Sequence, residues 1–242
     1  MNILICTIMR DVEHSIERYL KQLTDALAFC GPGYNWYLSI YENDSTDSTS
    51  HILLNLNYSY FKDYSLIIER LNTKKYGSIK VDDRVKNLAN SRNKCLESKE
   101  LYKKVDYILF IESDVVYTPD YLHNIINFKK YGLQNVDIFS GLTIIPETGQ
   151  VYDIWATRRN HIEESGDRFE DWTIHPTREF WSTFNGVVLY NAEPFKKGIR
   201  FDWYNKRLNK FDCDTVVICE LFREAGFNKI YVNQALICFH GV

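Results

Sequence analysis

Short apolar runs alternate along the chain with longer segments in which apolar residues recur at helical spacing. Strands buried on both faces of a sheet are predicted at 3–9, 36–42, 65–69, 107–111 and 136–143. Helices are predicted at 12–27, from 48 to about 56, at 82–101 and at 119–130. Strands that alternate with helices indicate an α/β fold built on a mainly parallel, doubly wound sheet.

The pattern becomes less regular in the second half of the chain. Residues 147–181 show no clear period and are rich in polar and aromatic residues. Beyond them we predict strands at 187–190 and 235–239, and a helix at 215–225 that Gly226 closes. No repeat, low-complexity tract or linker interrupts the chain, so we expect a single domain over residues 1–242.

Composition narrows the function classes. With 45% hydrophobic and 25% charged residues the chain resembles ordinary globular proteins, and its net charge of −3 gives no basic surplus for nucleic acid. Its six cysteines include no Cys-x-x-Cys pair, which favours buried free thiols over a zinc site. No apolar stretch reaches membrane-spanning length and no signal peptide follows Met1, so we expect no membrane span and a cytoplasmic location. A catalytic domain that has lost its anchor is the alternative.

The clearest candidate site follows the predicted strand 107–111. Glu112 and Asp114 come directly after it, and both point to the same side if the extended backbone persists. Open α/β sheets bind ligands at this carboxyl edge, and carboxylates suit Mg²⁺ or Mn²⁺ with diphosphate oxygens completing the shell. His240, after the last predicted strand, is a third candidate metal ligand. The alternatives are solvated acids at a strand end and a structural histidine.

Three further groups of polar residues have two interpretations each. Glu42 and Asp44 lie at the end of a strand, where they can accept hydrogen bonds from a base and ribose. The alternative is that the Asp, Asn and Ser residues of this turn only cap the next helix. Arg92 lies within an apolar helical stripe and needs an anion, either a diphosphate or a core carboxylate. Arg84, two turns earlier, is solvated or reaches the same site.

Two acids open the last predicted helix. Asp212 and Asp214 precede residues 215–225, after the irregular region in which an acceptor cleft would form. A fixed carboxylate there can accept a hydroxyl proton, and helix capping is the alternative.

Taken in order, these segments resemble a known family. Residues 41–45 (Tyr-Glu-Asn-Asp-Ser), 89–97 and 112–116 look like the fungal capsule-type α-1,3-mannosyltransferases and, more distantly, the large GT-A families of inverting transferases. Residues 152–158 and 214–226 continue the likeness, which therefore spans most of the chain. The resemblance implies a GT-A (Rossmann-like) fold, with a nucleotide-binding half at 1–118 and an acceptor-binding half at 119–242.

The resemblance also implies roles for residues on the donor side. Glu42 and Asp44 would hold the base and ribose, and Arg92 and Glu112 would complete the nucleotide site. Asp114 would be the direct metal ligand, with Glu112 and His240 beside it. Glu112 stands where Asp commonly opens this motif.

On the sugar side, the resemblance implies that Asn185 and Gly186 line the donor-sugar pocket. Asp153 and Trp155 would contact the acceptor, and Asp214 or Asp212 would be the catalytic carboxylate. Retaining and inverting enzymes share this fold, so the stereochemistry stays open.

The predicted function is transfer of a hexose or pentose from a nucleotide-diphosphate sugar to a glycan or glycoconjugate acceptor, with Mn²⁺ or Mg²⁺ as cofactor and GDP-mannose as the first donor to test. A sugar-phosphate nucleotidyltransferase is one alternative, but it usually carries a glycine-rich loop after the first strand, and residues 7–11 contain no glycine. A non-catalytic carbohydrate-binding protein is the other, and it would not need two acidic clusters at strand ends.

Overall fold

A single twisted sheet runs through the molecule, in a computed structural model that describes residues 1–77, 79–162 and 177–241. Eight strands along its path follow the order β3-β2-β1-β4-β9-β6-β12-β5. Their bounds are Asp63–Glu69, Asn35–Asn43, Asn2–Met9, Tyr107–Ile111, Val187–Asn191, Ile138–Ile145, Ile230–His240 and Val115–Val116. The short strands β7 (Gln150–Val151) and β8 (Thr177–Glu179) add to β6 and β12, and β10 (Tyr204–Asn205) pairs with β11 (Lys210–Phe211) in a separate ribbon.

The long strands are mostly parallel. β1 lies parallel to both β2 and β4, β2 to β3, and β6 to β12. The exception is β9, which is antiparallel to its neighbours β4 and β6. The sequence prediction of an α/β fold with a mainly parallel sheet is therefore confirmed.

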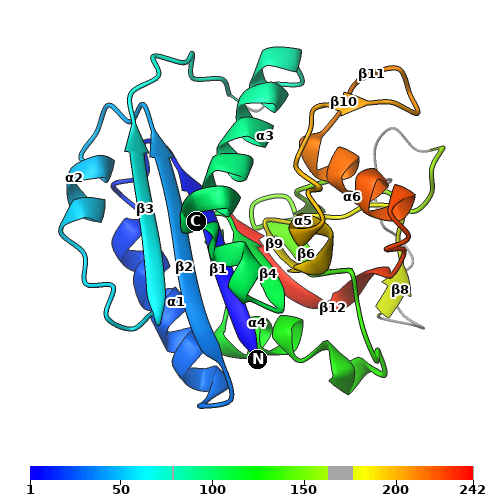
Figure 1. Cartoon of the computed structure of the whole chain (residues 1–242), viewed down its shortest axis with the longest axis horizontal. Coiled ribbons are helices and arrows are strands. Elements are labelled where there is room, and N and C mark those ends of the chain that lie inside the picture. Colours follow the sequence, from blue (N-terminus) through cyan, green and yellow to red (C-terminus); the bar gives the residue numbers. More distant parts are fainter. Residues whose placement is uncertain (78, 163–176, 242) are drawn as a thin grey trace.

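Helices cover both faces of the sheet (Figure 1). Successive residues of β1 alternate between the two layers: Ile3 and Ile5 pack with α1 (Ile16–Cys30) and α4 (Pro119–Ile126). Leu4 and Cys6 pack in the opposite layer with α3 (Asp82–Glu97) and α6 (Asp214–Glu224). This alternation explains the continuous apolar runs in the sequence, because both faces of each central strand are buried.

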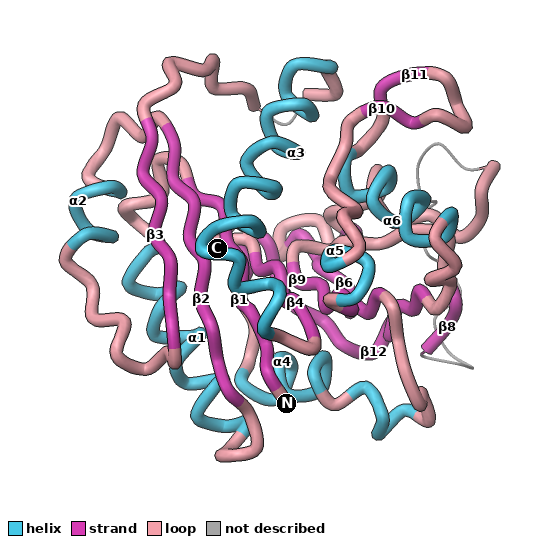
Figure 2. The backbone as a smooth tube through the Cα atoms, in the orientation of Figure 1, coloured by secondary structure: helices cyan, strands magenta, loops and turns pink. Residues whose placement is uncertain are grey.

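The remaining helices are short. They are α2 (Thr49–Leu54) and α5 (Glu193–Lys196), with 3₁₀ turns at Ser98–Lys104 and Phe128–Tyr131. The backbone tube separates β3, β2 and α1 on one side of the molecule from α6, β8 and the β10–β11 ribbon on the other (Figure 2). Within the described ranges, no helix is both long enough and apolar enough to cross a membrane.

Two predicted elements differ from the structure. The helix predicted at 82–101 ends at Glu97, because Lys99 and Glu100 adopt positive φ angles of 49° and 52° and the chain turns into a 3₁₀ segment. The last strand begins at Ile230, five residues before its predicted start. Its apolar pattern is interrupted by Asn233 and Gln234, which are nevertheless buried.

Candidate active site

Two adjoining cavities open at the carboxyl edge of the sheet. The larger, of about 380 Å³, is lined by the end of β1, residues 73–77, one face of α3, residues 112–114 and His240. The smaller, of about 250 Å³, lies against Asp153, Trp155 and Asp214. Arg84, Leu88, Glu112 and Tyr152 line both cavities. The structure thus brings the two predicted halves of the chain together around one continuous cleft.

Asp114 and His240 face each other in the larger cavity. The antiparallel pairing of β12 with β5 sets His240 opposite Val115, and the Tyr152 ring stacks on the His240 ring with centroids 3.5 Å apart. His240 Nε2 lies 3.0 Å from Asp114 Oδ2. The Nε2 atom is buried with Asp114 Oδ2 as its polar contact, and Asp114 Oδ1 is buried without a hydrogen-bond partner among the described residues.

These two atoms fit a divalent cation. A carboxylate oxygen and an imidazole nitrogen are both ligands of Mn²⁺-type ions, and buried polar atoms without partners are otherwise costly. Across the described residues, no group of three or more His, Cys, Asp and Glu side chains is placed to hold a metal. Substrate phosphate oxygens and water would complete the coordination shell, as is common for Mg²⁺.

Glu112 turns toward Arg92 instead of joining this pair. Its backbone N–H donates to Gly186 O at 2.8 Å, and its Oε1 lies 3.3 Å from Arg92 Nη2. Burial and the neighbouring Asp114 carboxylate raise the pKa of Glu112 to about 8, against the opposing effect of Arg92. The structure therefore does not place Glu112 in a three-ligand group with Asp114 and His240.

Arg92 is occupied by carboxylates. Its Nη1 pairs with Asp214, and its guanidinium lies 4.7 Å from the centre of the Phe184 ring. Burial acts to lower the pKa of Arg92, but Asp214 and Glu112 raise it overall, so the group stays charged. A diphosphate and a core carboxylate were the two partners considered for Arg92, and in the described part of the chain its partners are core carboxylates.

Asp214 lies where an acceptor carboxylate was predicted. It lines the smaller cavity and is almost fully buried. Burial raises the pKa of Asp214 above its usual range although Arg92 acts to lower it. Cys213 is the N-cap of α6 and makes no side-chain capping bond, whereas Asp214 lies in the first turn, where an acid also suits the helix dipole.

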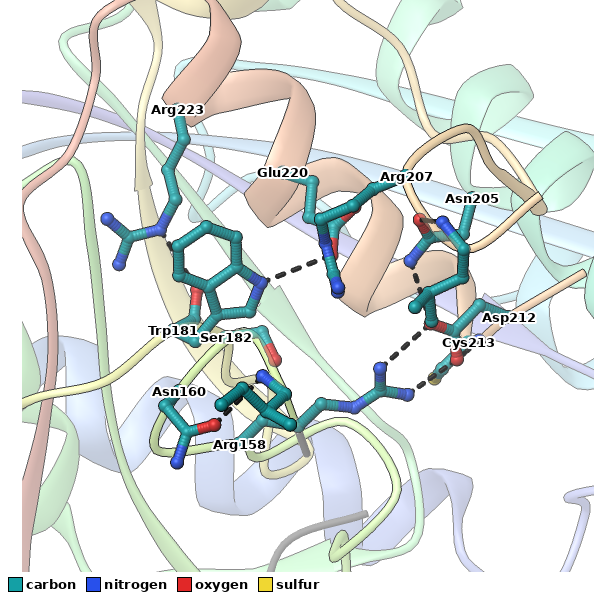
Figure 3. A network of polar contacts seen from close by, with 12 residues as sticks. Arg158, Asn160, Trp181, Ser182, Asn205, Arg207, Asp212, Cys213, Glu220 and Arg223 are labelled. Carbon is teal, nitrogen blue, oxygen red and sulfur yellow. Dashed lines mark hydrogen bonds and ion pairs between the residues drawn. The ribbon is translucent and has the colours of Figure 1, made fainter. Parts of the chain in front are cut away.

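Asp212 lies outside both cavities in a separate buried network (Figure 3). Arg158, whose side chain is fully buried, donates from Nη1 and Nη2 to its carboxylate at 2.8 and 2.5 Å. Asn205 Nδ2 donates to Oδ2 at 2.9 Å, and the Cys213 N–H donates to Oδ1 at 2.8 Å. The structure brings Asp214 to the cleft and does not bring Asp212 there.

Glu42 and Asp44 are buried and bonded to the protein itself. Glu42 accepts the Ser45 N–H and the Ser50 hydroxyl at 2.8 and 2.7 Å. Asp44, at φ 61°, accepts the N–H groups of residues 71, 72 and 73 at 2.6 to 2.9 Å. Burial opposes ionisation of Asp44, but the hydrogen bonds from Thr73 and its neighbours hold its pKa well below the usual range.

Neither carboxylate lines either of these two cavities, whereas Asn43 and Thr73 beside Asp44 line the larger one. Asp44 therefore fixes the loop that forms the nucleotide side of the cleft. Contact of either acid with base or ribose stays a prediction.

Asn185 and Gly186 form a tight turn beneath the metal pair. Both have positive φ angles, 54° and 64°. A Cβ on Gly186 would lie 2.7 Å from Val115 Cγ2, so this position admits only glycine. The Asn185 amide donates to Thr157 and Thr183, and its N–H donates to Asp153 Oδ2 at 3.0 Å. The turn supports the cleft from below, and contact with the donor sugar stays a prediction.

Asp153 and Trp155 line the smaller cavity together with Asp214, as the acceptor prediction requires. Burial raises the pKa of Asp153. Lys80 lies 5.0 Å from the centre of the Trp155 ring, so the loop before α3 contacts the acceptor side of the cleft.

The basic wall of the larger cavity is formed by Arg10, Lys74, Lys75 and Arg84, and of these four the sequence analysis considered only Arg84. Residues 7–11 were considered for a glycine-rich phosphate loop and residues 72–78 as a surface loop, and neither segment was predicted to contact a ligand. The adjacent Lys74 and Lys75 were the available signal, but a surface loop commonly carries such residues without a ligand.

The sequence matches a family model described as Cryptococcal mannosyltransferase 1 over residues 2–221. No curated protein sequence matches the chain.

Solved structures with a similar fold are all distant in sequence. The mannosyltransferase PcManGT from Pyrobaculum calidifontis, in complex with GDP-Man and Mn²⁺, is 13% identical with a TM-score of 0.55, and the match covers 100% of this chain and 56% of that one. S. aureus TarS 1-349 in complex with UDP is 14% identical with a TM-score of 0.54, covering 100% and 61%.

A third is glucosyl-3-phosphoglycerate synthase from Mycobacterium tuberculosis with Mn²⁺, UDP-Glc and phosphoglyceric acid, which is 13% identical with a TM-score of 0.50, covering 99% and 71%. The chain spans only 56% to 61% of the first two. At these identities the likeness shows the fold alone, and the predicted GT-A fold is confirmed.

Proposed function

The chain belongs to the Cryptococcal mannosyltransferase 1 family of glycosyltransferases, and we propose that it transfers mannose from GDP-mannose to a glycan or glycoconjugate acceptor with Mn²⁺ or Mg²⁺. The observation that supports the metal-dependent donor is the close pair of Asp114 and His240, in which Asp114 Oδ1 is buried without a hydrogen-bond partner among the described residues, beside a cavity with a basic wall. Phosphate oxygens, a cation and basic side chains attract one another there.

The donor sugar is proposed from the family, and the nucleotide is proposed with it. Among the similar structures, PcManGT holds GDP-Man, whereas TarS holds UDP and the synthase holds UDP-Glc. Because of these complexes, UDP-linked hexoses or pentoses are the first alternative donors to test. The cytoplasmic location expected from the sequence stays a prediction.

The two cavities are proposed to have different roles in the reaction. Asp114 and His240 would hold a divalent cation, which would supply positive charge to stabilise the departing diphosphate. In the smaller cavity Asp214 is proposed to lie nearest the acceptor hydroxyl, held in place by Arg92 on α3. Asp153 and Trp155 are proposed to orient the acceptor beside it.

Donor hydrolysis provides the test, with Asp114→Asn as the informative variant. Purified protein is incubated with GDP-mannose, UDP-glucose and UDP-xylose, with Mn²⁺ or with EDTA, and release of nucleoside diphosphate is followed. We expect Mn²⁺-dependent release from GDP-mannose, and a loss of at least about 100-fold in Asp114→Asn, since metal stabilisation of the leaving group contributes several kcal/mol.

The matched control is Asp25→Asn, which removes a half-exposed carboxylate of α1 that pairs only with Lys21. It should retain wild-type rates. Equal release from the wild type and a well-folded Asp114→Asn, or no release from any donor, would contradict the proposal.

A further inference from the structure

Arg84 stands where the two cavities meet. It lies in the first turn of α3, on the same stripe as Leu88 and Arg92, and it lines both the larger and the smaller cavity. Burial raises the pKa of Tyr152 beside the Asp114–His240 pair and of Asp214 in the smaller cavity, and the charge of Arg84 acts on both groups in the opposite direction. The half-buried guanidinium is thus close to the boundary between the two spaces.

Arg84 differs from Arg10, Lys75 and Arg92 of the cleft in having no hydrogen-bond or ion-pair partner among the described residues. Arg10 donates to Thr73 at 2.8 and 3.1 Å, and Lys75 pairs with Asp11 at 2.5 Å. Arg92 is held by Asp214 and Glu112. Among the residues that the structure describes, none forms a hydrogen bond or ion pair with Arg84.

An arginine in this state is suited to an external anion. A partly desolvated guanidinium without a carboxylate gains most from a ligand that accepts two parallel hydrogen bonds, and phosphate groups are such ligands. Lys74, the other unpaired cation of the larger cavity, is exposed and lies over the Tyr76 ring at 5.2 Å. Arg84 is better placed to hold an anion inside the cleft.

The place of Arg84 also specifies when its charge is needed. If the diphosphate occupies the larger cavity and the sugar the smaller one, the bond between them crosses the boundary that Arg84 lines. We propose that Arg84 binds the diphosphate of the donor and stabilises the negative charge that this group gains as the sugar leaves it. This inference rests on the proposed function.

In the inverting case, one bond breaks, one bond forms and one proton moves. The bond between the anomeric carbon and the phosphate oxygen breaks, and its electron pair stays on that oxygen, facing Arg84. The acceptor hydroxyl oxygen forms the new bond to the anomeric carbon, and its proton passes to the Asp214 carboxylate. No electrons are gained or lost overall.

Calorimetric titration of GDP in EDTA tests the binding role without any metal. Arg84→Gln should weaken GDP binding at least about 10-fold, since a hydrogen bond to a charged group contributes more than one between neutral groups. Arg84→Lys should lose less than Arg84→Gln, because it keeps the charge but not the paired donors. In the presence of Mn²⁺, donor hydrolysis by Arg84→Gln should show a lower kcat as well as a higher KM.

Lys86→Gln is the matched control. Lys86 is exposed on the same helix, lies over Trp203 at 5.0 Å and lines neither cavity, so this variant removes one positive charge without touching the cleft. It should bind GDP like the wild type.

Two results overturn the inference in different ways. Wild-type affinity in a folded Arg84→Gln, with GDP still bound by the wild-type protein, overturns the role of Arg84 alone. Failure of the wild-type protein to bind GDP or UDP, with and without Mn²⁺, overturns this inference together with the proposed function.

Discussion

Glu112 and Asp114 emerge from the same strand end, yet their carboxylates meet different surroundings. Asp114 faces His240 at the metal pair, whereas Glu112 faces Arg92 above the Gly186 turn. Two residues of one motif therefore have different partners: Asp114, the proposed metal ligand, pairs with His240, and Glu112 pairs with Arg92. The carboxyl group of Glu112 is buried next to another acid, and this environment favours its protonated form.

This environment predicts how stability changes with pH in metal-free protein. The pKa of Glu112 is raised from an ordinary 4.5 to about 8 in the folded state. Between these values the folded protein binds one proton more than the unfolded chain, so this group makes the free energy of unfolding fall as pH rises. Urea unfolding in EDTA at about pH 5 and about pH 8 should show this decrease, and Glu112→Gln should reduce it.

Glu17→Gln, at an exposed position of α1, serves as the control and should leave the slope of stability against pH unchanged. A wild-type slope in Glu112→Gln would mean that other groups cause the pH dependence.

Among the elements, α6 is connected at its N-terminus to two other parts of the molecule. Asp214 at its first residue connects it to α3 through Arg92, and Asp212 just before it connects it to the 158 region through Arg158. Further along α6, Glu220 accepts hydrogen bonds from Trp181 and Arg207 (Figure 3). The helix is thereby fixed between the cleft and a buried polar layer, so its first carboxylate has a defined position.

The two acids should consequently respond differently to the same change. Asp212→Asn leaves the Arg158 charge buried without its counterion, and we expect a loss of about 3 kcal/mol or more in unfolding free energy. Transfer per folded molecule should stay within about threefold of the wild type. Asp214→Asn should lower transfer at least tenfold, since a positioned proton acceptor contributes about 10²–10⁴-fold, with GDP affinity retained.

Urea unfolding and transfer assays on the folded fraction of both variants measure the difference. A stable Asp212→Asn that has lost transfer, beside an active Asp214→Asn, would reverse the two roles.

For the whole molecule, the cleft joins segments that lie far apart in the sequence. The larger cavity is lined by residues from the end of β1, the loop 73–77, one face of α3 and the segment 112–114, together with Tyr152 and His240. They come together only when β1, β4 and β12 occupy their places in one sheet. Any ligand of this cavity therefore binds the folded chain and not the unfolded one.

Ligands should accordingly stabilise the whole domain. GDP with Mn²⁺, each at about 100 times its dissociation constant, should raise the unfolding free energy by about 2.7 kcal/mol or more, which corresponds to about 5–10 °C in Tm for a chain of this size. Scanning fluorimetry measures the shift, and Asp114→Asn should lose the part that depends on Mn²⁺. An equal shift with GDP in EDTA would show that the cation adds nothing to binding.

The sequence by itself determined the α/β class, the order of the long strands and helices, and the acidic end of β4. These features follow from local periodicity and from both faces of the central strands being buried, as the runs at 107–111 and 3–9 show. The edge at which strands end is likewise a property of the chain direction, so the place of the cleft was predictable.

Only the tertiary structure decided which partner each charged side chain meets. Asp212 and Asp214 are two residues apart in sequence and look alike in pattern, yet one faces Arg158 and the other Arg92, over separations of 54 and 122 residues. Asp44 accepts hydrogen bonds from the backbone of the 71–73 loop, which its sequence neighbours did not indicate. Periodicity records burial and backbone direction, whereas ion pairs and hydrogen bonds depend on distances between atoms that the chain brings together only when it folds.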